Sequence, residues 1–401
     1  MQGLIDQRIE EIKLCFQNDD INRTSQRLLD LVYDFDFGES ARKSALKIRK
    51  NYNKSKELGR VKIENKALHQ ELNILLEEIK NQQPAIPEEV GQKKILARFS
   101  NISKQFKSRL HNFNFKPISL DLIQGKIIGL VGENGNGKTT LLRMLSGELS
   151  ADSGHIEYYL NEMPIRDWQF IKKKIAFIPQ RLERWYGTAE ENISFHAANK
   201  GFKGEKNKEK VDFIIGRMGL TNFRELSWPE ISSGYKLRIE IAMALVWEPE
   251  ILILDEPLAN LDIQAQELLL QDLRNLADSI RNPASIILSS QQLHEVETIA
   301  DQVIFLKNGN AVFNGNLKDF KNMETSLTFE VNGNFSYLDL QELLFNWEEI
   351  KIEQSASSFT ISCSGNHSKE EFLKLLANNN IDINYFRNIS GSTKKLFNDK
   401  Y

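Results

Sequence analysis

The chain has 401 residues, 41% of them hydrophobic, and a formal net charge of -3 from nearly equal numbers of basic and acidic residues. This composition indicates a globular protein of two or three domains and excludes binding of polyanions through overall charge. Cys15 and Cys363 are far apart, which excludes a disulfide framework and favours a reducing compartment. The acid-bearing N-terminus predicts no signal peptide, and no apolar run reaches the roughly 18 residues of a membrane span.

Residues 1–83 are predicted to form a helical N-terminal segment, because apolar residues recur at helical spacing near both of its ends. Within it, residues 42–66 carry ten Lys or Arg against two acids. Two interpretations remain open: a solvated helix face, or a surface for anionic lipid heads or nucleic acid. The apolar positions are Ile5, Ile9, Ile12 and Phe16, followed by Leu68, Leu72, Leu75 and Ile79.

Three further segments follow along the chain. Residues 84–95 contain two prolines and predict a linker. Residues 96–323 alternate short apolar strands with helices, which favours an α/β domain with a mainly parallel sheet. Residues 324–401 show the order strand, helix, strand, strand, helix, strand, which predicts a small α+β, ferredoxin-like C-terminal domain with a role in dimerisation or regulation.

A phosphate-binding loop is the strongest signal in the chain. The apolar strand KIIGLV runs into GENGNGKTT, which matches the pattern GxxxxGK[ST] ahead of a helical run. Gly132, Gly135 and Gly137 let consecutive backbone N–H groups point inward and form an anion cradle. Lys138 can reach the β- and γ-phosphate oxygens, and the Thr139 hydroxyl can complete a Mg²⁺ shell.

A second apolar strand, ILIL, ends in Asp255 and Glu256. Paired carboxylates at the end of a buried strand indicate a cation or a water molecule between them and the substrate. We therefore expect Asp255 to bind Mg²⁺, through water, and Glu256 to polarise the water that attacks the phosphate.

The second motif lies within WPEISSGYKLRIEIAMALVWEPEILILDEPLANLD, and over about residues 97–320 the chain resembles an ATP-binding cassette (ABC) ATPase. The resemblance implies an α/β, ABC-type P-loop NTPase domain with a helical signature subdomain, and ATP and Mg²⁺ as cofactors. It implies that Gln180 in IAFIPQ is the Q-loop glutamine, a catalytic residue and Mg²⁺ ligand. The implied nucleotide contacts of the phosphate loop are Gly132, Asn134, Gly135, Asn136, Gly137, Lys138, Thr139 and Thr140.

Further nucleotide contacts are implied outside that loop. The resemblance places an adenine-stacking aromatic at Phe106, with Phe113 or Phe115 as alternatives. It identifies ISSGY as the signature sequence, and Asp262 in ANLD as the end of the D-loop. The signature residues implied to contact nucleotide are Ser232, Ser233 and Gly234.

The signature also implies a partner subunit, because in the family this helix end reaches the γ-phosphate bound by the opposite cassette. We therefore expect a homodimer, or a pair with another cassette, around two ATP molecules. Two residues depart from the family's pattern: Ser233 replaces a glycine and Tyr235 a glutamine.

The segment Gln180–Tyr186 corresponds to the groove that receives a helix of the membrane-spanning subunit in the family. Arg184, Trp185 and Tyr186 would supply an amphipathic anchor set there. Plain local packing of the two aromatic residues is an equal alternative.

The segment IILSSQQLHEVE resembles the switch segment, where the family has a histidine that contacts the γ-phosphate. Spacing puts Gln291 at that position, with Glu295 and Glu297 matching the acids that follow, whereas His294 lies three residues later. An amide can donate a hydrogen bond but carries no positive charge, so we expect slow hydrolysis that lacks a histidine's pH dependence.

Three functions follow from these motifs. The first is the ATPase subunit of a transporter, cytoplasmic and peripheral to the cytoplasmic face of the membrane, with separate membrane-spanning chains. The second is a soluble ABC ATPase that acts on the ribosome or on nucleic acid through residues 42–66. The third is a cassette that binds ATP as a clamp and hydrolyses it poorly, for which Gln291 is the argument.

Overall fold

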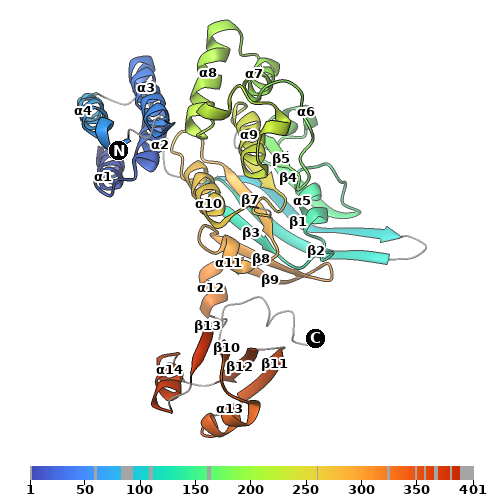
Figure 1. Cartoon of the computed structure of the whole chain (residues 1–401). Coiled ribbons are helices and arrows are strands. Elements are labelled where there is room, and N and C mark those ends of the chain that lie inside the picture. The colour runs from blue at the N-terminus through green and yellow to red at the C-terminus, as the bar shows by residue number, and fades with distance from the viewer. Residues whose placement is uncertain are drawn as a thin grey trace.

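The computed structural model describes most of the chain, from Gln2 to Asn388 with gaps (Figure 1). Most of the expected linker at 84–95 and the end of the expected C-terminal domain, 389–401, lie outside the described residues. In the part of the chain that the structure describes, no helix combines the length and the apolar character needed to cross a bilayer. The described ranges are 2–57, 61–82, 94–107, 112–159, 164–259, 261–322, 326–347, 350–355, 358–364, 369–379 and 382–388.

The N-terminal segment is helical, as predicted. The apolar positions expected to share a face are buried, from Ile5 at 1% exposure to Ile79 at 1%, and only Phe16 is partly exposed. The Asp20 side chain caps the second helix by accepting a hydrogen bond from the backbone N–H of Arg23. The helices are α1 (Gln2–Gln17), α2 (Ile21–Phe35), α3 (Gly38–Glu57) and α4 (Val61–Lys80).

A six-stranded sheet forms the centre of the molecule, in the order β5-β6-β7-β3-β8-β9 (Figure 1). All neighbouring strands pair in parallel except β8 and β9. The middle strands β3, β6 and β7 are buried along their whole length, as expected of a sheet covered on both faces. The strands are β3 (Ile127–Val131), β5 (Ile175–Ile178), β6 (Ile251–Leu254), β7 (Ser285–Ser290), β8 (Gln302–Lys307) and β9 (Asn310–Asn316).

A three-stranded antiparallel sheet, in the order β2-β1-β4, packs beside the central sheet. Its apolar side chains join those of β3 and α5 in one hydrophobic cluster. The elements are β1 (Ile95–Lys107), β2 (Asn112–Ile123), β4 (Ser153–Tyr158), α5 (Lys138–Leu145) and α6 (Trp168–Lys172).

Helices α7, α8 and α9 form a helical part beyond the edge strand β5 (Figure 1). A capping box between Thr188 and Glu191 begins α7. Helix α10 lies nearer the central sheet. The bounds are α7 (Ala189–Asn199), α8 (Gly204–Arg217), α9 (Ser233–Leu245), α10 (Ile263–Ala277), α11 (Leu293–Val296) and α12 (Leu317–Asn322).

The C-terminal unit follows the predicted order of strands and helices and has its own hydrophobic core, which includes Phe329, Ile361 and Phe372. Its four strands are all antiparallel, in the sheet order β11-β12-β10-β13. The elements are β10 (Ser326–Gly333), α13 (Tyr337–Leu343), β11 (Ile350–Ser355), β12 (Ser358–Ser364), α14 (Lys369–Asn378) and β13 (Ile383–Asn388).

The N-terminal helices share one continuous hydrophobic core with α8, α9 and α10. Polar groups are buried at the same junction. Arg217 at the end of α8 donates a 2.8 Å hydrogen bond to Asp30 of α2, and both residues are under 8% exposed. Gln26 donates to the buried carboxylate of Asp272 in α10 at 2.5 Å. Because a buried charge is costly without its partner, these contacts hold α2 against both α8 and α10.

The basic stretch 42–66 is described with side chains only up to Lys54. Arg49 is buried and donates to the backbone carbonyl of Gly216 and to Asn22. Lys47 pairs with Glu71 at 2.9 Å, and Lys50 lies 3.6 Å from Asp212. These contacts within the chain favour the helix-face interpretation for the described part of the stretch.

Burial raises the pKa of Asp34 to about 6 from its usual 3.8, although Arg217 opposes the shift. The folded chain therefore keeps this proton where the unfolded chain has lost it. The stability this gives is complete below about pH 4 and is lost as the pH rises through about 6. Asp34→Asn keeps an acceptor for the Ser279 hydroxyl and removes the titration.

We therefore expect the difference in melting temperature, Asp34→Asn minus wild type, to be about 4 °C larger at pH 7 than at pH 4. Differential scanning calorimetry at several pH values measures this difference. A difference that stays constant across the range would show that Asp34 does not titrate in this way.

Candidate nucleotide site

The phosphate loop lies between β3 and α5, at the carboxyl ends of the central parallel strands. Gly135 and Gly137 have φ values of 81° and 97°, in the left-handed region that favours glycine. A Cβ atom at Gly137 would lie 2.9 Å from the ring atoms of both Phe113 and Phe115, so the loop packs directly on β2. The loop therefore needs glycine at position 137 for both conformation and space.

The remaining residues of the loop differ in how deeply they are buried. Asn134 is exposed at its tip, and Thr140 is half-buried in the first turn of α5. Asn136 is buried, and its side-chain oxygen accepts a 2.7 Å hydrogen bond from the backbone N–H of Asn308. At Gly132 a Cβ atom would lie 2.7 Å from the carbonyl oxygen of Leu306. Asn136 and Gly132 thus hold the loop on the β8–β9 hairpin.

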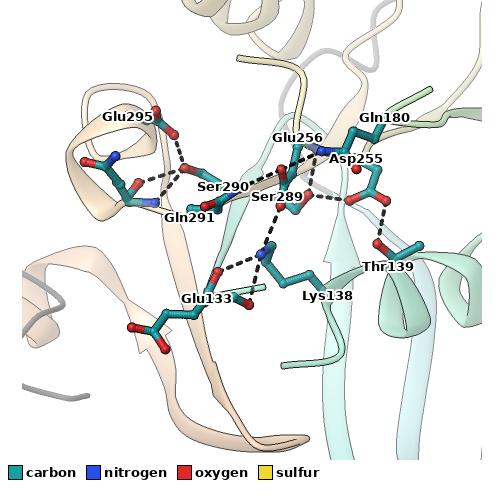
Figure 2. A network of polar contacts seen from close by, with 12 residues as sticks. Glu133, Lys138, Thr139, Gln180, Asp255, Glu256, Ser289, Ser290, Gln291 and Glu295 are labelled. Carbon is teal, nitrogen blue, oxygen red and sulfur yellow. Dashed lines mark hydrogen bonds and ion pairs between the residues drawn. The ribbon is translucent and has the colours of Figure 1, made fainter. Parts of the chain in front are cut away.

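The predicted catalytic side chains converge on Glu256 (Figure 2). Lys138 Nζ lies 3.1 Å from one carboxylate oxygen of Glu256, with both side chains under 10% exposed. Gln180 and Gln291 donate to the other oxygen, at 2.8 Å and 3.0 Å. Lys138 also donates to the backbone carbonyls of Gly132 and Glu133. The structure therefore brings together four residues that are far apart in the sequence.

Ser289 is a residue of this site that sequence reasoning missed. Its hydroxyl donates to Asp255 Oδ1 at 2.7 Å and accepts from the backbone N–H of Glu256 at 2.8 Å. Ser289 is fully buried at the end of β7, next to the end of β6. The signal in the sequence was a pair of serines at the end of an otherwise apolar strand, which is where a buried hydroxyl needs a partner.

The backbone of Glu256 has a φ of 48°, which is uncommon for a residue other than glycine. Pro257 follows it and disfavours the right-handed helical conformation. The backbone N–H of Glu256 donates a hydrogen bond to the Ser289 hydroxyl, which holds this conformation. The conformation directs the Glu256 side chain toward Lys138. Strain of this kind is maintained only where the surroundings fix it.

The oxygen groups predicted to bind Mg²⁺ are adjacent. The Thr139 hydroxyl donates to Asp255 Oδ2 at 2.7 Å, and Asp255 is 4% exposed. Gln180 uses its amide nitrogen toward Glu256, which leaves its carbonyl oxygen for a cation. Hydroxyl, carboxylate and amide oxygens suit Mg²⁺, which usually takes few protein ligands and keeps water and phosphate oxygens in its shell. The residues present therefore fit this ion.

The three candidates for adenine stacking differ in exposure. Phe115 is completely buried, so its ring is part of the core. Phe106 is 39% exposed at the end of β1 and faces Phe113 across the hairpin, with ring centroids 6.4 Å apart. Phe106 and Phe113 thus keep an accessible aromatic surface near the phosphate loop.

The signature residues form a separate cluster from the network of Figure 2. Ser232 is the N-cap of α9, and both Ser232 and Ser233 are exposed. A Cβ at Gly234 would lie 3.1 Å from Leu261, so the signature lies against the D-loop segment. Asp262 caps α10 by accepting from the backbone N–H of Ala265, and Asn260 lies outside the described residues.

Tyr235, where the resemblance implies a glutamine, stacks on Phe223 with ring centroids 3.7 Å apart. Its ring therefore packs within its own chain. Similarly, Trp185 is half-buried and contacts Trp228 edge-on at 5.3 Å, whereas Tyr186 is 82% exposed beside Arg184. In the segment Gln180–Tyr186, local packing thus accounts for Trp185, and Arg184 and Tyr186 face solvent.

Gln291 lines a small pocket of about 150 Å³ together with Glu256, Ser290 and Glu295. The Ser290 hydroxyl contacts the Glu295 carboxylate and the backbone of Gln292, which holds the turn after β7 (Figure 2). This turn aims the Gln291 amide at Glu256. His294 lies in the following helix α11 and is not part of this pocket.

This fold and this loop define a P-loop ATP-binding protein of the cassette type, and the comparisons with known proteins agree. Residues 115–259 match the family described as ABC transporter. An uncharacterised ABC transporter ATP-binding protein of Bacillus subtilis, YxlF, is 30% identical over 64% of this chain and 81% of its own length. The chain therefore belongs to the ABC transporter family as an ATP-binding protein, and it is an ATPase.

Two further similarities extend this finding. The methionine import ATP-binding protein MetN 1 of Acinetobacter baylyi is 31% identical over 51% of this chain and 58% of its own length. Among solved structures, cbiO1 from Clostridium perfringens superposes with a TM-score of 0.51 and 24% identity, covering 57% of this chain and 92% of that one. The likeness to cbiO1 concerns the fold.

Ser289→Ala should lower kcat for ATP hydrolysis about tenfold, because it removes a hydrogen bond to Asp255 and leaves the N–H of Glu256 without its acceptor. The KM for ATP should change less than about threefold, since the phosphate loop is untouched. Steady-state kinetics measure both constants.

Ser289→Thr is the matched control, because it keeps the hydroxyl and should retain most of kcat. A loss of activity that is equal in the alanine and threonine variants would contradict the role of the hydroxyl.

Proposed function

We propose that the chain is the ATP-hydrolysing subunit of an ABC transporter, working as a head-to-tail dimer around two Mg²⁺–ATP and driving separate membrane-spanning subunits. The observation that carries this proposal is the convergence of Lys138, Gln180 and Gln291 on the single carboxylate of Glu256. A protein that bound ATP without hydrolysing it would need the phosphate loop. It would not need a buried carboxylate that three side chains hold in place.

In this proposal each residue has one task. Lys138 exchanges its contacts with the loop carbonyls and Glu256 for the β- and γ-phosphate oxygens. Glu256, once released, accepts a proton from the attacking water. Thr139, Asp255 and Gln180 would hold Mg²⁺, which neutralises negative charge on the phosphates when bound. The aromatic surface of Phe106, with Phe113 beside it, would stack on adenine.

The signature supports the dimer. Ser232 and Ser233 are exposed at the N-terminus of α9, a helix of 13 residues, and a helix N-terminus attracts anions. In a head-to-tail pair, Ser232, Ser233 and Gly234 would contact the γ-phosphate on the partner cassette, and Asp262 would lie at the same interface.

The membrane partner is proposed from two features. Arg184 and Tyr186 project from the segment after Gln180, where a membrane-spanning subunit would dock. Relatives carry names such as methionine import and Fe(3+) ions import ATP-binding protein. We place the chain in the cytoplasm, at the cytoplasmic face of the membrane.

The proposed domains are a helical segment at 1–83, a linker at 84–95, the nucleotide-binding domain at 96–323 and a C-terminal α+β domain at 324–401. The strand order of the C-terminal sheet supports a ferredoxin-like module. Its separate core supports a role in dimerisation or regulation rather than in catalysis.

Slow hydrolysis is proposed from Gln291. Its amide donates to Glu256 at 3.0 Å, so it can orient the carboxylate, but it adds no positive charge where negative charge develops on the γ-phosphate. Charge-assisted hydrogen bonds are roughly twice as strong as neutral ones.

Glu256→Gln should reduce ATP turnover at least about 100-fold, because an amide cannot accept the proton of the attacking water. ATP binding should persist, so a dimer with bound ATP should accumulate and be visible by size-exclusion chromatography with light scattering.

The control for this variant is Glu342→Gln, which changes an exposed glutamate of α13 by the same chemistry and should hydrolyse ATP like wild type. Turnover at the wild-type rate in Glu256→Gln would refute Glu256 as the group that activates water.

Gln291→His should raise turnover several-fold at pH 6.5 and make it fall as the pH rises. The reason is that the nearby Glu256 carboxylate favours the protonated imidazole, which carries the charge the amide lacks. Turnover measured from pH 6 to pH 9 tests this. The neighbouring Gln292→His, at an exposed position, is the control and should leave the pH profile flat. Lower turnover in Gln291→His would mean that the site is built around the amide.

A further inference from the structure

A large cleft lies between the N-terminal helices and the helical part of the cassette. It has a volume of about 840 Å³ and is lined by α3 between residues 39 and 51 and by α8 between residues 205 and 213. We name it the α3–α8 cleft. Its volume is in the range of sites that bind small organic molecules, and none of its lining residues belongs to the network of Figure 2.

The inner part of the α3–α8 cleft is apolar and aromatic. Tyr33, Leu46, Phe202 and Phe213 line it, and the rings of Tyr33 and Phe213 stack with centroids 4.9 Å apart. Tyr33 is 8% exposed, and its hydroxyl donates to Glu248 and accepts from Asn282. This fixed ring gives the cleft a rigid apolar wall.

Basic side chains lie around this wall. Lys210, with a side chain 12% exposed, lies 5.7 Å from the ring centroids of both Tyr33 and Phe202. Arg281 lies 5.5 Å from the Tyr33 ring. The lining holds eight basic and five acidic side chains. Just outside it, Asp36 pairs with Arg42 and Arg281, and Glu71 pairs with Lys47.

Within the lining, acidic side chains pair with some of the basic ones. Glu248 pairs with Lys210, Asp212 lies 3.6 Å from Lys50, and Glu39 pairs with Lys43. The side chains of Glu39 and Lys43 are about two-thirds exposed, so this ion pair is weak and can break. Lys206 and Lys208 are exposed and make no ion pair with any residue that the structure describes.

We propose that the α3–α8 cleft binds a small organic anion that carries an apolar or aromatic group. The apolar part packs on Tyr33, Leu46 and Phe202, and the charged group faces the lysines of α8. Such a ligand would touch α3 and α8 together, and therefore join the N-terminal helices to the helical part of the cassette.

The test uses anilinonaphthalene sulfonate, an aromatic anion whose fluorescence increases on leaving water, titrated against the full chain. Wild type should show saturable binding. The double variant Lys206→Glu/Lys208→Glu should weaken binding about tenfold by reversing the unpaired charges. The control Lys318→Glu/Lys374→Glu changes net charge equally at exposed lysines outside the cleft and should bind within about twofold of wild type.

Both double variants should hydrolyse ATP like wild type, which shows that they are folded. Inorganic sulfate, which has the charge but no apolar group, should displace the probe only at concentrations at least about 100-fold higher than those at which the probe binds. The proposal is wrong if wild type shows no saturable binding, if both double variants weaken it equally, or if sulfate competes as well as the aromatic anion.

Discussion

The site depends on one buried hydroxyl between two strand ends. Ser289, at the end of β7, bonds the side chain of Asp255 and the backbone of Glu256, at the end of β6. These contacts hold the proposed Mg²⁺ ligand and the proposed base in one arrangement, with Glu256 in a left-handed conformation that it would not adopt alone. The parallel sheet makes this possible, because it aligns the carboxyl ends of β3, β6 and β7 at one edge.

Three donor side chains surround the Glu256 carboxylate. The carboxylate is held by Lys138, Gln180 and Gln291, so the residue that would activate water is engaged with the residue that would bind phosphate. In the proposed mechanism, phosphate oxygens compete for Lys138 and thereby free Glu256. In that mechanism Gln291 would position Glu256 through the hydrogen bond from its uncharged amide.

The N-terminal helices are integrated into the cassette rather than appended to it. Asp30 and Arg217 form a buried pair between α2 and α8, and Gln26 reaches Asp272 in α10. Helix α10 begins at the D-loop, and α8 belongs to the helical part that carries the signature. A movement of that helical part against the sheet would therefore change the packing of α2. The α3–α8 cleft lies at this junction.

The sequence alone determined the elements, the phosphate loop and the carboxylate pair, because these depend on local patterns: apolar periodicity, glycine spacing and strand ends. It also predicted that Gln291 occupies the switch position. Only the tertiary structure decided that Gln291 contacts Glu256, that Ser289 joins Asp255 to Glu256, and that the basic helix α3 turns Arg49 inward. Those outcomes arise between segments far apart in the chain, and packing geometry, which no local pattern records, selects them.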